Sequence, residues 1–360
     1  MAKSQSKNPH TAFSEIPVID IAGLYSCNIN DRKQVAIQLA KAAREVGFFY
    51  IEGHRISQSR VDSLINAARQ FFSQPLNVKM HSYIGLSQNH SGYVPEGEER
   101  FYSTALDPSK IDHKESYDLG FDLQDRVYQR PMLGPNLWPD LKDFKSRVES
   151  YYAEALELGN LLFKGFALAL GLPENTLISK VTRPPSQLRL VHYPYDETAE
   201  DREGIGAHTD YECFTLLLTT SDGLQVLNGN GEWINAPHRP GSFIVNIGDM
   251  LEILSNGRFL ATSHRVRKVK EERFSFPLFC SLDYDTLVES ILPPQIGATS
   301  NKYDALVCGD HLYAQTIQTF QYLQRRLALG EIALPEASKT LATFGQFKPL
   351  VDAARPTGDE

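Results

Sequence analysis

The chain has 360 residues, of which 42% are hydrophobic and 22% are charged, so a sizeable core can be buried and a disordered chain is excluded. The formal net charge is −8 and the charges form no long block of one sign, which argues against a nucleic-acid surface or a polybasic membrane patch. We therefore expect a small-molecule partner, no nucleic acid and no membrane; the sequence leaves the oligomeric state open.

The chain also lacks the sequence signals of export. Its longest apolar stretch, residues 161–172, is interrupted by Lys164 and is too short to cross a bilayer. The opening MAKSQSKNPH has no hydrophobic signal-peptide segment. The four cysteines form no C-x-x-C pair and indicate neither a zinc knuckle nor a disulfide framework: Cys27, Cys213, Cys280 and Cys308. These features favour a cytoplasmic protein.

The first part of the chain predicts alternating strands and helices. IPVIDIAGL at residues 16–24 alternates like a short strand, and residues 30–47 place apolar side chains at helical spacing, with Asn30 or Asp31 as the cap. FFYIEGH then predicts a second strand, and Ser57–Phe72 a second amphipathic helix. We expect a β-α-β-α opening.

The middle and end of the chain predict a different organisation. Residues 77–139 are rich in turn formers and tyrosines, which favours long connections, some of them lining a pocket. A long, mostly buried helix is expected from Asp140 to the GLP at residues 171–173. From Gln187 onward, short strands separated by Gly, Asn, Asp and Pro favour a sandwich or jelly roll, closed by a helix at His311–Leu327.

One motif in the strand region carries metal-ligand chemistry. In GAHTDYECFTLLL, His208 and Asp210 stand two positions apart, and residues i and i+2 at a strand end point to the same face. The pattern alone is weak, because about one such match is expected by chance, and His113 with Glu115 is a second match. A third ligand is available as His264 in another predicted strand, and two histidines with one carboxylate are the ligand set of non-haem Fe(II) oxygenases.

A second motif follows on the next predicted strand. In ERFSFPLF, Arg273 and Ser275 again stand two residues apart. A guanidinium is a planar fork suited to a carboxylate, and a hydroxyl can add a further hydrogen bond. A dicarboxylate could thus be held at one end while its other end reaches the metal.

These motifs, together with IPVIDIAGL, EVGFFYIEGH, LRLVHYP and VNIGDMLEILSNGRFLATSHRV, resemble in order and spacing the iron- and 2-oxoglutarate-dependent dioxygenases of the isopenicillin N synthase-like branch. The resemblance implies an α+β fold: a double-stranded β-helix, or jelly roll, flanked by N-terminal and C-terminal helices. It implies Fe(II), 2-oxoglutarate and O2 as cofactor and cosubstrates, with decarboxylation to succinate and CO2 coupled to hydroxylation, desaturation or cyclisation of a small organic substrate. The implied iron ligands are His208, Asp210 and His264, and the implied 2-oxoglutarate residues are Arg273, Ser275 and Tyr193.

The resemblance also implies boundaries and pocket residues. We expect a flexible leader at 1–15, an N-terminal non-haem dioxygenase region with its long helix at 16–180, the jelly-roll core at 181–290, a C-terminal helical segment at 291–345 and a tail at 346–360. By analogy, five aromatic residues are expected to touch the substrate: Tyr93, Phe101, Tyr117, Tyr211 and Phe279. The segment around His113 and Glu115 is interpreted as a pocket wall or a structural turn.

Four alternatives stay open at this point. An oxidase like isopenicillin N synthase shares Arg-x-Ser, although His90 and the terminal PTGDE depart from its pattern. SGYVPEGEE at residues 91–99 is similar to the ethylene-forming enzyme, which fragments 2-oxoglutarate itself. A zinc hydrolase can use two histidines and a carboxylate but needs no dicarboxylate clamp. A non-enzymatic jelly roll would be expected to have lost a ligand or the arginine, and neither is lost.

Overall fold

Two facing β-sheets form the centre of the computed structural model, which describes residues 12–100, 113–125, 127–195, 203–267, 271–294 and 300–335. Within these ranges the larger sheet has eight strands in the order β1 (Val18–Asp20), β2 (Phe48–Glu52), β10 (Phe243–Ile247), β7 (Phe214–Thr219), β12 (Arg273–Cys280), β5 (Gln187–Tyr193), β4 (Glu115–Leu119) and β3 (Gly92–Val94). The smaller sheet has four, in the order β6 (Glu203–His208), β11 (His264–Arg267), β8 (Leu224–Leu227) and β9 (Trp233–Asn235). The arrangement agrees with the predicted α+β jelly roll.

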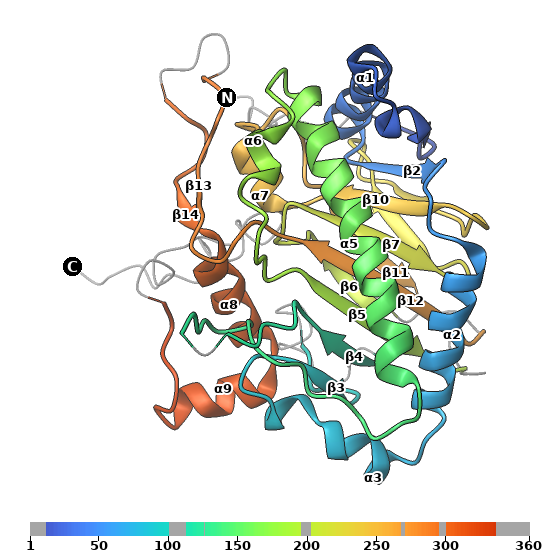
Figure 1. The fold of residues 1–360 in the computed structure, drawn as a ribbon, viewed down its shortest axis with the longest axis vertical. Helices are drawn as coiled ribbons and strands as arrows, with labels where there is room; N and C mark the ends of the chain where they lie inside the picture. Colours follow the sequence, from blue (N-terminus) through green and yellow to red (C-terminus); the bar gives the residue numbers. More distant parts are fainter. Residues whose placement is uncertain are drawn as a thin grey trace, which may run out of the picture.

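Three helices cover the outer face of the larger sheet. The long helix α5 (Phe144–Ala169) crosses that face, and α1 (Ile29–Glu45) and α2 (Gln58–Phe72) pack against it (Figure 1). Ser57 caps α2 by accepting a hydrogen bond from the Arg60 backbone N–H, whereas Asn28, and not Asn30 or Asp31, caps α1. Gly47 follows α1 with φ 73°, and a Cβ there would lie 2.3 Å from the Leu260 carbonyl oxygen, so the turn requires glycine.

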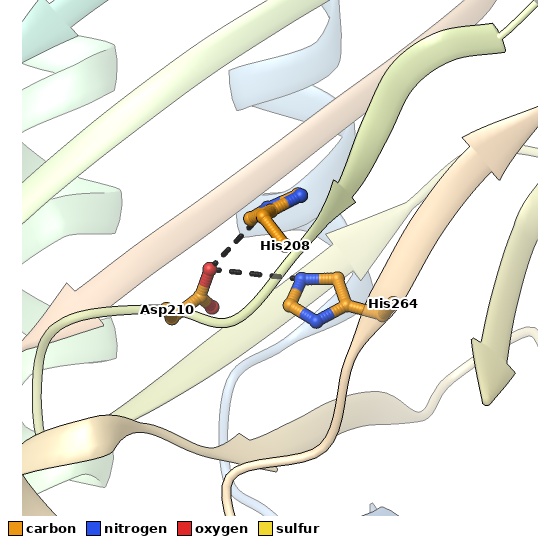
Figure 2. A group of neighbouring side chains, drawn as sticks. All are labelled: His208, Asp210 and His264. Atoms are coloured by element: carbon orange, nitrogen blue, oxygen red, sulfur yellow. Dashed lines mark ion pairs between the residues drawn. The ribbon is translucent and has the colours of Figure 1, made fainter. Parts of the chain in front are cut away.

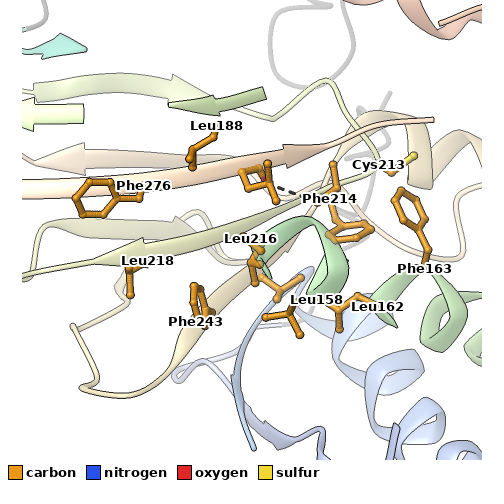
Figure 3. Close-up of a cluster of buried hydrophobic side chains, with 14 of the residues drawn as sticks. Leu158, Leu162, Phe163, Leu188, Cys213, Phe214, Leu216, Leu218, Phe243 and Phe276 are labelled. Atoms are coloured by element: carbon orange, nitrogen blue, oxygen red, sulfur yellow. Dashed lines mark hydrogen bonds between the residues drawn. The ribbon is translucent and has the colours of Figure 1, made fainter. Parts of the chain in front are cut away.

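Side-chain alternation along the central strands separates a helix-facing core from an inner face. Leu216 and Leu218 on β7, with Leu188 on β5 and Phe276 on β12, belong to the core that packs against α5 (Figure 3). The intervening residue Leu217 belongs to a second apolar cluster between the sheets. A period of two therefore directs every second residue of these strands toward the smaller sheet, where polar side chains can form a site.

The described residues of the segment 77–139 are more regular than the sequence indicates. Its strands β3 and β4 extend the larger sheet beyond β5, and α3 (Leu76–Lys79), η2 (Met80–Ser82) and η3 (Ile84–Leu86) precede them. The strands are too short and too mixed in composition to produce a periodic signal. Three other short elements were also not predicted: η1 (Ala22–Tyr25), α6 (Asn175–Ile178) and α7 (Asp249–Leu254).

The expected closing helix is in fact two helices. α8 (Cys308–Thr319) follows the strand pair β13 (Leu287–Val288) and β14 (Leu306–Val307), and α9 (Gln321–Ala328) begins after a break at Phe320. Phe320 is extended, pairs its backbone with Glu99 in an isolated bridge, and buries its ring. Tertiary contact thus overrides the helical pattern. Among the described residues, no helix is long and apolar enough to span a membrane.

Candidate active site

The candidate metal ligands come together where two strands of the smaller sheet meet. His208 is the last residue of β6 and His264 the first of β11, and the two are directly opposite in the antiparallel pairing. Both Nε2 atoms lie 3.6 Å from Asp210 Oδ1, and the three ligand atoms lie within 4.8 Å of one another (Figure 2). The fold therefore brings the side chains of residues 208, 210 and 264 to one point.

The position of Asp210 differs from the expectation that strand alternation aligns it with His208. Asp210 lies beyond β6, in the turn that leads to β7, and its carbonyl oxygen accepts a hydrogen bond from the Asp249 backbone N–H at the start of α7. The turn, and not the pleat of a strand, places the carboxylate beside the imidazoles.

Backbone carbonyls fix the orientation of both imidazole rings. His208 Nδ1 lies 2.8 Å from the Gly206 carbonyl oxygen, and His264 Nδ1 lies 3.2 Å from that of Thr262. A carbonyl oxygen can only accept, so each Nδ1 carries the proton and donates it. Each Nε2 then presents a lone pair toward Asp210, as a metal-binding histidine requires.

Two side chains of the larger sheet hold the carboxylate of Asp210. Thr215 on β7 and Asn246 on β10 both donate to Oδ2, the latter at 2.7 Å, so Oδ1 is the oxygen that faces the histidines. Burial would raise the pKa of Asp210, but the neighbouring His264 and His208 and these two hydrogen bonds lower it overall. Burial and then His264 lower the pKa of His208 to about 4. At neutral pH the cluster thus has an ionised carboxylate and a neutral His208, and this donor set fits Fe(II).

Arg273 offers the second feature of the site. It is the first residue of β12, lies opposite Tyr193 of β5, and is fully buried, with its Cζ 4.8 Å from the centre of the Tyr193 ring. Nε has a long contact of 3.4 Å with the Ser221 carbonyl oxygen, whereas Nη1 and Nη2 have no hydrogen-bond partner among the described residues. Burial lowers the pKa of this guanidinium. A buried, unpaired cation is costly, which indicates that an anionic ligand completes it.

One cavity joins the triad to Arg273. Its walls include both sets of residues named above, with Ser275 and Tyr193 beside Arg273, and apolar side chains from both sheets. Two of the five aromatic residues expected at the substrate, Tyr211 and Phe279, line this cavity. The residues predicted to bind the metal and the cosubstrate, and two of those predicted to touch the substrate, therefore line one cavity.

Two of the other three aromatic residues, Tyr93 and Tyr117, do not line the cavity. Tyr93 and Tyr117 are buried on the helix side of the sheet, where both rings pack edge-on against Phe71. Their places in β3 and β4 direct them away from the inner face. Phe101 lies outside the described residues.

The second H-x-E match forms no metal cluster in the structure. His113 pairs with Glu96, while Glu115 accepts hydrogen bonds from Lys79 at 2.6 Å and Tyr93 at 2.6 Å. The residue between them, Lys114, does line the cavity. The interpretation of this segment as part of a pocket wall therefore holds for Lys114.

Sequence reasoning missed the charged residues at the far end of the cavity. Glu99, Lys114 and Arg189 line it, although they come from segments far apart in the chain. For Arg189 a signal existed: in LRLVHYP it stands four residues before Tyr193, and therefore on the same face of β5. Glu99 and Lys114 lie in a segment where the sequence predicts no helix or strand, so no periodic pattern indicated where their side chains point.

Comparison with known proteins identifies the class. Residues 16–141 match a family described as the non-haem dioxygenase in morphine synthesis N-terminal region, and residues 184–282 match the 2OG-Fe(II) oxygenase superfamily. A 2-oxoglutarate-Fe(II) type oxidoreductase of Metarhizium rileyi is 32% identical, with 82% of this chain and 85% of that protein covered. A homoarginine-6-hydroxylase of Oryza sativa is also 32% identical, with 86% and 98% covered.

Solved structures agree with these matches. The crystal structure of a full-length Neurospora crassa protein in complex with alpha-ketoglutarate superimposes with a TM-score of 0.73 at 27% identity, covering 90% of this chain and all of that one. The chain belongs to the 2OG-Fe(II) oxygenase superfamily, in its isopenicillin N synthase-like branch. It is an oxidoreductase that uses Fe(II) and 2-oxoglutarate and acts on a small substrate, and the predicted fold, enzyme class and cofactors are confirmed.

Proposed function

We propose that His208, Asp210 and His264 hold the Fe(II), and that Arg273, Ser275 and Tyr193 bind the distal carboxylate of 2-oxoglutarate. The observation that carries this proposal is the buried Arg273 guanidinium, whose two terminal nitrogens have no partner among the described residues and which shares one cavity with the triad. A carboxylate is the planar acceptor that completes such a fork. A hydrolytic metal site would have no use for it.

The residues of this chain have separate tasks in that reaction. Fe(II), 2-oxoglutarate and O2, when bound, would supply an oxidant for a C–H bond, with release of succinate and CO2. Thr215 and Asn246 orient Asp210, and the carbonyls of Gly206 and Thr262 orient the two imidazoles. Apolar side chains between the sheets, among them Val191, Leu217, Leu224 and Val266, exclude water around the arginine: they belong to one buried cluster with Tyr193.

We further propose hydroxylation, desaturation or ring closure of a small organic substrate as the outcome. Among the relatives, plant homoarginine-6-hydroxylases and a Dictyostelium discoideum 1-aminocyclopropane-1-carboxylate oxidase carry names of amino acids, and the Neurospora crassa protein has also been crystallised with thymine. These names support a small polar substrate. The predicted jelly-roll core at residues 181–290 is part of the same proposal, and strands β5 to β12 lie within it.

The experiment that tests this proposal uses the metal-free full chain. Anaerobic addition of Fe(II) and 2-oxoglutarate should produce the weak visible charge-transfer band of the iron-bound keto acid, and O2 should then bleach it with release of succinate. Bound iron without a band would contradict the assignment of Arg273 to 2-oxoglutarate. Ethylene in amounts comparable to succinate would show that the enzyme fragments 2-oxoglutarate instead of oxidising a second substrate.

A further inference from the structure

The end of the cavity away from Arg273 carries a network of buried charges. Glu99 Oε1 lies 2.8 Å from Arg189 Nη1, and Glu99 Oε2 lies 2.6 Å from Lys114 Nζ. Behind them, Asp118 forms a fork with Arg189, at 2.9 Å to Nη2 and 3.0 Å to Nε. Glu99, Lys114 and Arg189 line the cavity, whereas Asp118 is fully buried beneath it.

Stability does not account for this network. The three cavity-lining members are only 7 to 8% exposed, and removing charges from water costs more than a buried pair commonly returns. Apolar side chains of similar size would close the same wall at lower cost. Buried charges that face a cavity therefore indicate recognition of a ligand.

The network also lies too far from the cosubstrate residues to serve them. Gln187, Arg189, Val191 and Tyr193 line the cavity along one face of β5, and Tyr193 is the residue opposite Arg273. Arg189 and Tyr193 are four positions apart on this strand, which corresponds to about 13 Å along it. A ligand held at Arg273 and at the triad therefore leaves Arg189 for a second molecule.

The charges of the network indicate which charged groups that second molecule carries. Two cations, Arg189 and Lys114, face two carboxylates, Glu99 and Asp118, so their sum is zero. His90, which packs beside them, is neutral because burial lowers its pKa to about 3. A ligand with a net charge would leave that charge uncompensated in a buried space, whereas a ligand with one group of each sign would not.

Arg189 keeps hydrogen-bond capacity beyond its contacts with Glu99 and Asp118. Arg189 Nη1 lies 2.8 Å and 3.0 Å from the two carboxylate oxygens of Glu99, and Nε and Nη2 each contact Asp118, so of its five N–H groups at least one, on Nη2, is not used in these contacts. The rings of Phe279 and Phe320 lie 5.8 Å and 5.6 Å from Arg189 Cζ, so the guanidinium is held between aromatic walls. The guanidinium can therefore donate to a further carboxylate oxygen without leaving its present partners.

We propose that Glu99, Lys114 and Arg189 form the subsite for the oxidised substrate, and that this substrate is a zwitterionic α-amino acid. Its carboxylate would bind Arg189 and Lys114, and its ammonium group would bind Glu99. Its side chain then extends into the remaining cavity, toward the triad. The inference rests on the proposed function, because it assigns a substrate class to the same site.

The test uses the full chain loaded anaerobically with Fe(II) and 2-oxoglutarate. The probes are the common L-amino acids, and then the N-acetyl and carboxamide derivatives of those that respond; thymine and benzoate serve as a neutral and an anionic comparison. We expect at least one amino acid to shift the charge-transfer band and accelerate succinate formation after O2 is admitted. Blocking either charged group should weaken its binding by about 30-fold or more, the value of one charge-assisted hydrogen bond.

Variants separate recognition from folding. Glu99→Gln keeps the shape of the side chain and removes its charge, and should raise the Kd of the responding amino acid by about 30-fold or more while leaving the Kd of 2-oxoglutarate within about twofold. Lys114→Met should also raise the Kd of the responding amino acid, and in this variant Glu99 keeps its ion pair with Arg189. Glu98→Gln is the matched control, because this neighbouring buried carboxylate contacts the Tyr322 backbone N–H and does not line the cavity.

The possible outcomes distinguish a failure of the proposed substrate class from a failure of the proposed function. A normal charge-transfer band without a response to any zwitterion, or a response confined to thymine or benzoate, overturns the substrate class alone. Equal losses of 2-oxoglutarate and amino acid binding in Glu99→Gln would make the network structural. No band in the unchanged protein would overturn the proposed function and this inference with it.

Discussion

The two ends of the cavity differ in how their polar groups are satisfied. At the cosubstrate end, Arg273 Nη1 and Nη2 have no hydrogen-bond partner among the described residues, and the imidazole Nε2 atoms meet at a single carboxylate oxygen. At the network end, Glu99, Lys114 and Arg189 are paired with one another. In the proposed function the unpaired groups of Arg273 are completed by 2-oxoglutarate, whereas the paired groups of the network balance one another's charge without a ligand. Substitutions at the two ends should therefore have separable effects.

The largest effect is expected from Asp210→Ala. The substitution removes the oxygen on which both histidines converge and leaves two neutral ligands, so stoichiometric Fe(II) binding and turnover should both be lost. Equilibrium dialysis against Fe(II) measures the first and succinate release the second. Asp62→Ala, at an exposed aspartate of α2, is the control. Retention of one iron per chain in Asp210→Ala would show that the triad is not the metal site.

The second-largest effect is expected on 2-oxoglutarate binding alone. Arg273→Ala removes a desolvated charge-assisted pair worth about 2 to 3 kcal/mol, so the 2-oxoglutarate concentration required for half-maximal rate should rise by about 30- to 150-fold. Iron binding should change little, because Arg273 is on β12 and the histidines are on the smaller sheet. Arg267→Ala, at an exposed arginine of β11, should leave the requirement unchanged. An unaltered requirement in Arg273→Ala would assign the guanidinium to another ligand.

The same two ends show what the sequence could and could not predict. The cosubstrate end was predictable because His208, Asp210, His264, Arg273 and Ser275 lie in motifs whose spacing resembles a family, and because long amphipathic helices and apolar strands have a clear period. The network end was not, since Glu99 and Lys114 meet Arg189 only through the pairing of short strands and an extended residue at Phe320. Tyr93 and Tyr117 illustrate the limit: strand direction, which composition does not reveal, turned both into the core.

A smaller effect is expected from the residues that hold Asp210. Asn246→Ala removes the 2.7 Å hydrogen bond to Oδ2 and should weaken Fe(II) binding by about 10- to 100-fold, as for other residues that support a metal ligand. Substitution of the metal by Co(II) provides a second readout, because its visible spectrum should change with the freed carboxylate. Asn235→Ala, on the outer strand of the smaller sheet, removes a comparable side-chain bond far from the triad. If both variants bind iron alike, Asn246 does not position Asp210.

The smallest effect concerns the charge balance of the network end. His90 is buried, lies 2.7 Å from the Tyr322 hydroxyl through Nδ1, and has its pKa lowered to about 3 by burial and by the nearby charge of Arg189, with Glu99 opposing. In the unfolded chain its pKa is about 6.5. Between these two values the unfolded state binds more protons, so the free energy of unfolding falls as the pH falls, by at most about 1.4 kcal/mol per unit from this group.

His90→Asn should therefore flatten the acid side of the stability profile between about pH 6.5 and pH 3. Asparagine suits the position because His90 has φ 58°, a left-handed conformation that asparagine tolerates. Denaturant unfolding at several pH values measures the slope, and His81→Asn, at an exposed histidine, should leave it unchanged. An identical slope in His90→Asn would mean that His90 binds protons equally in the folded and unfolded states, so that it is charged in the folded protein below about pH 6.5. The network would then carry an additional positive charge, and a monocarboxylate would suit its cavity better than a zwitterion.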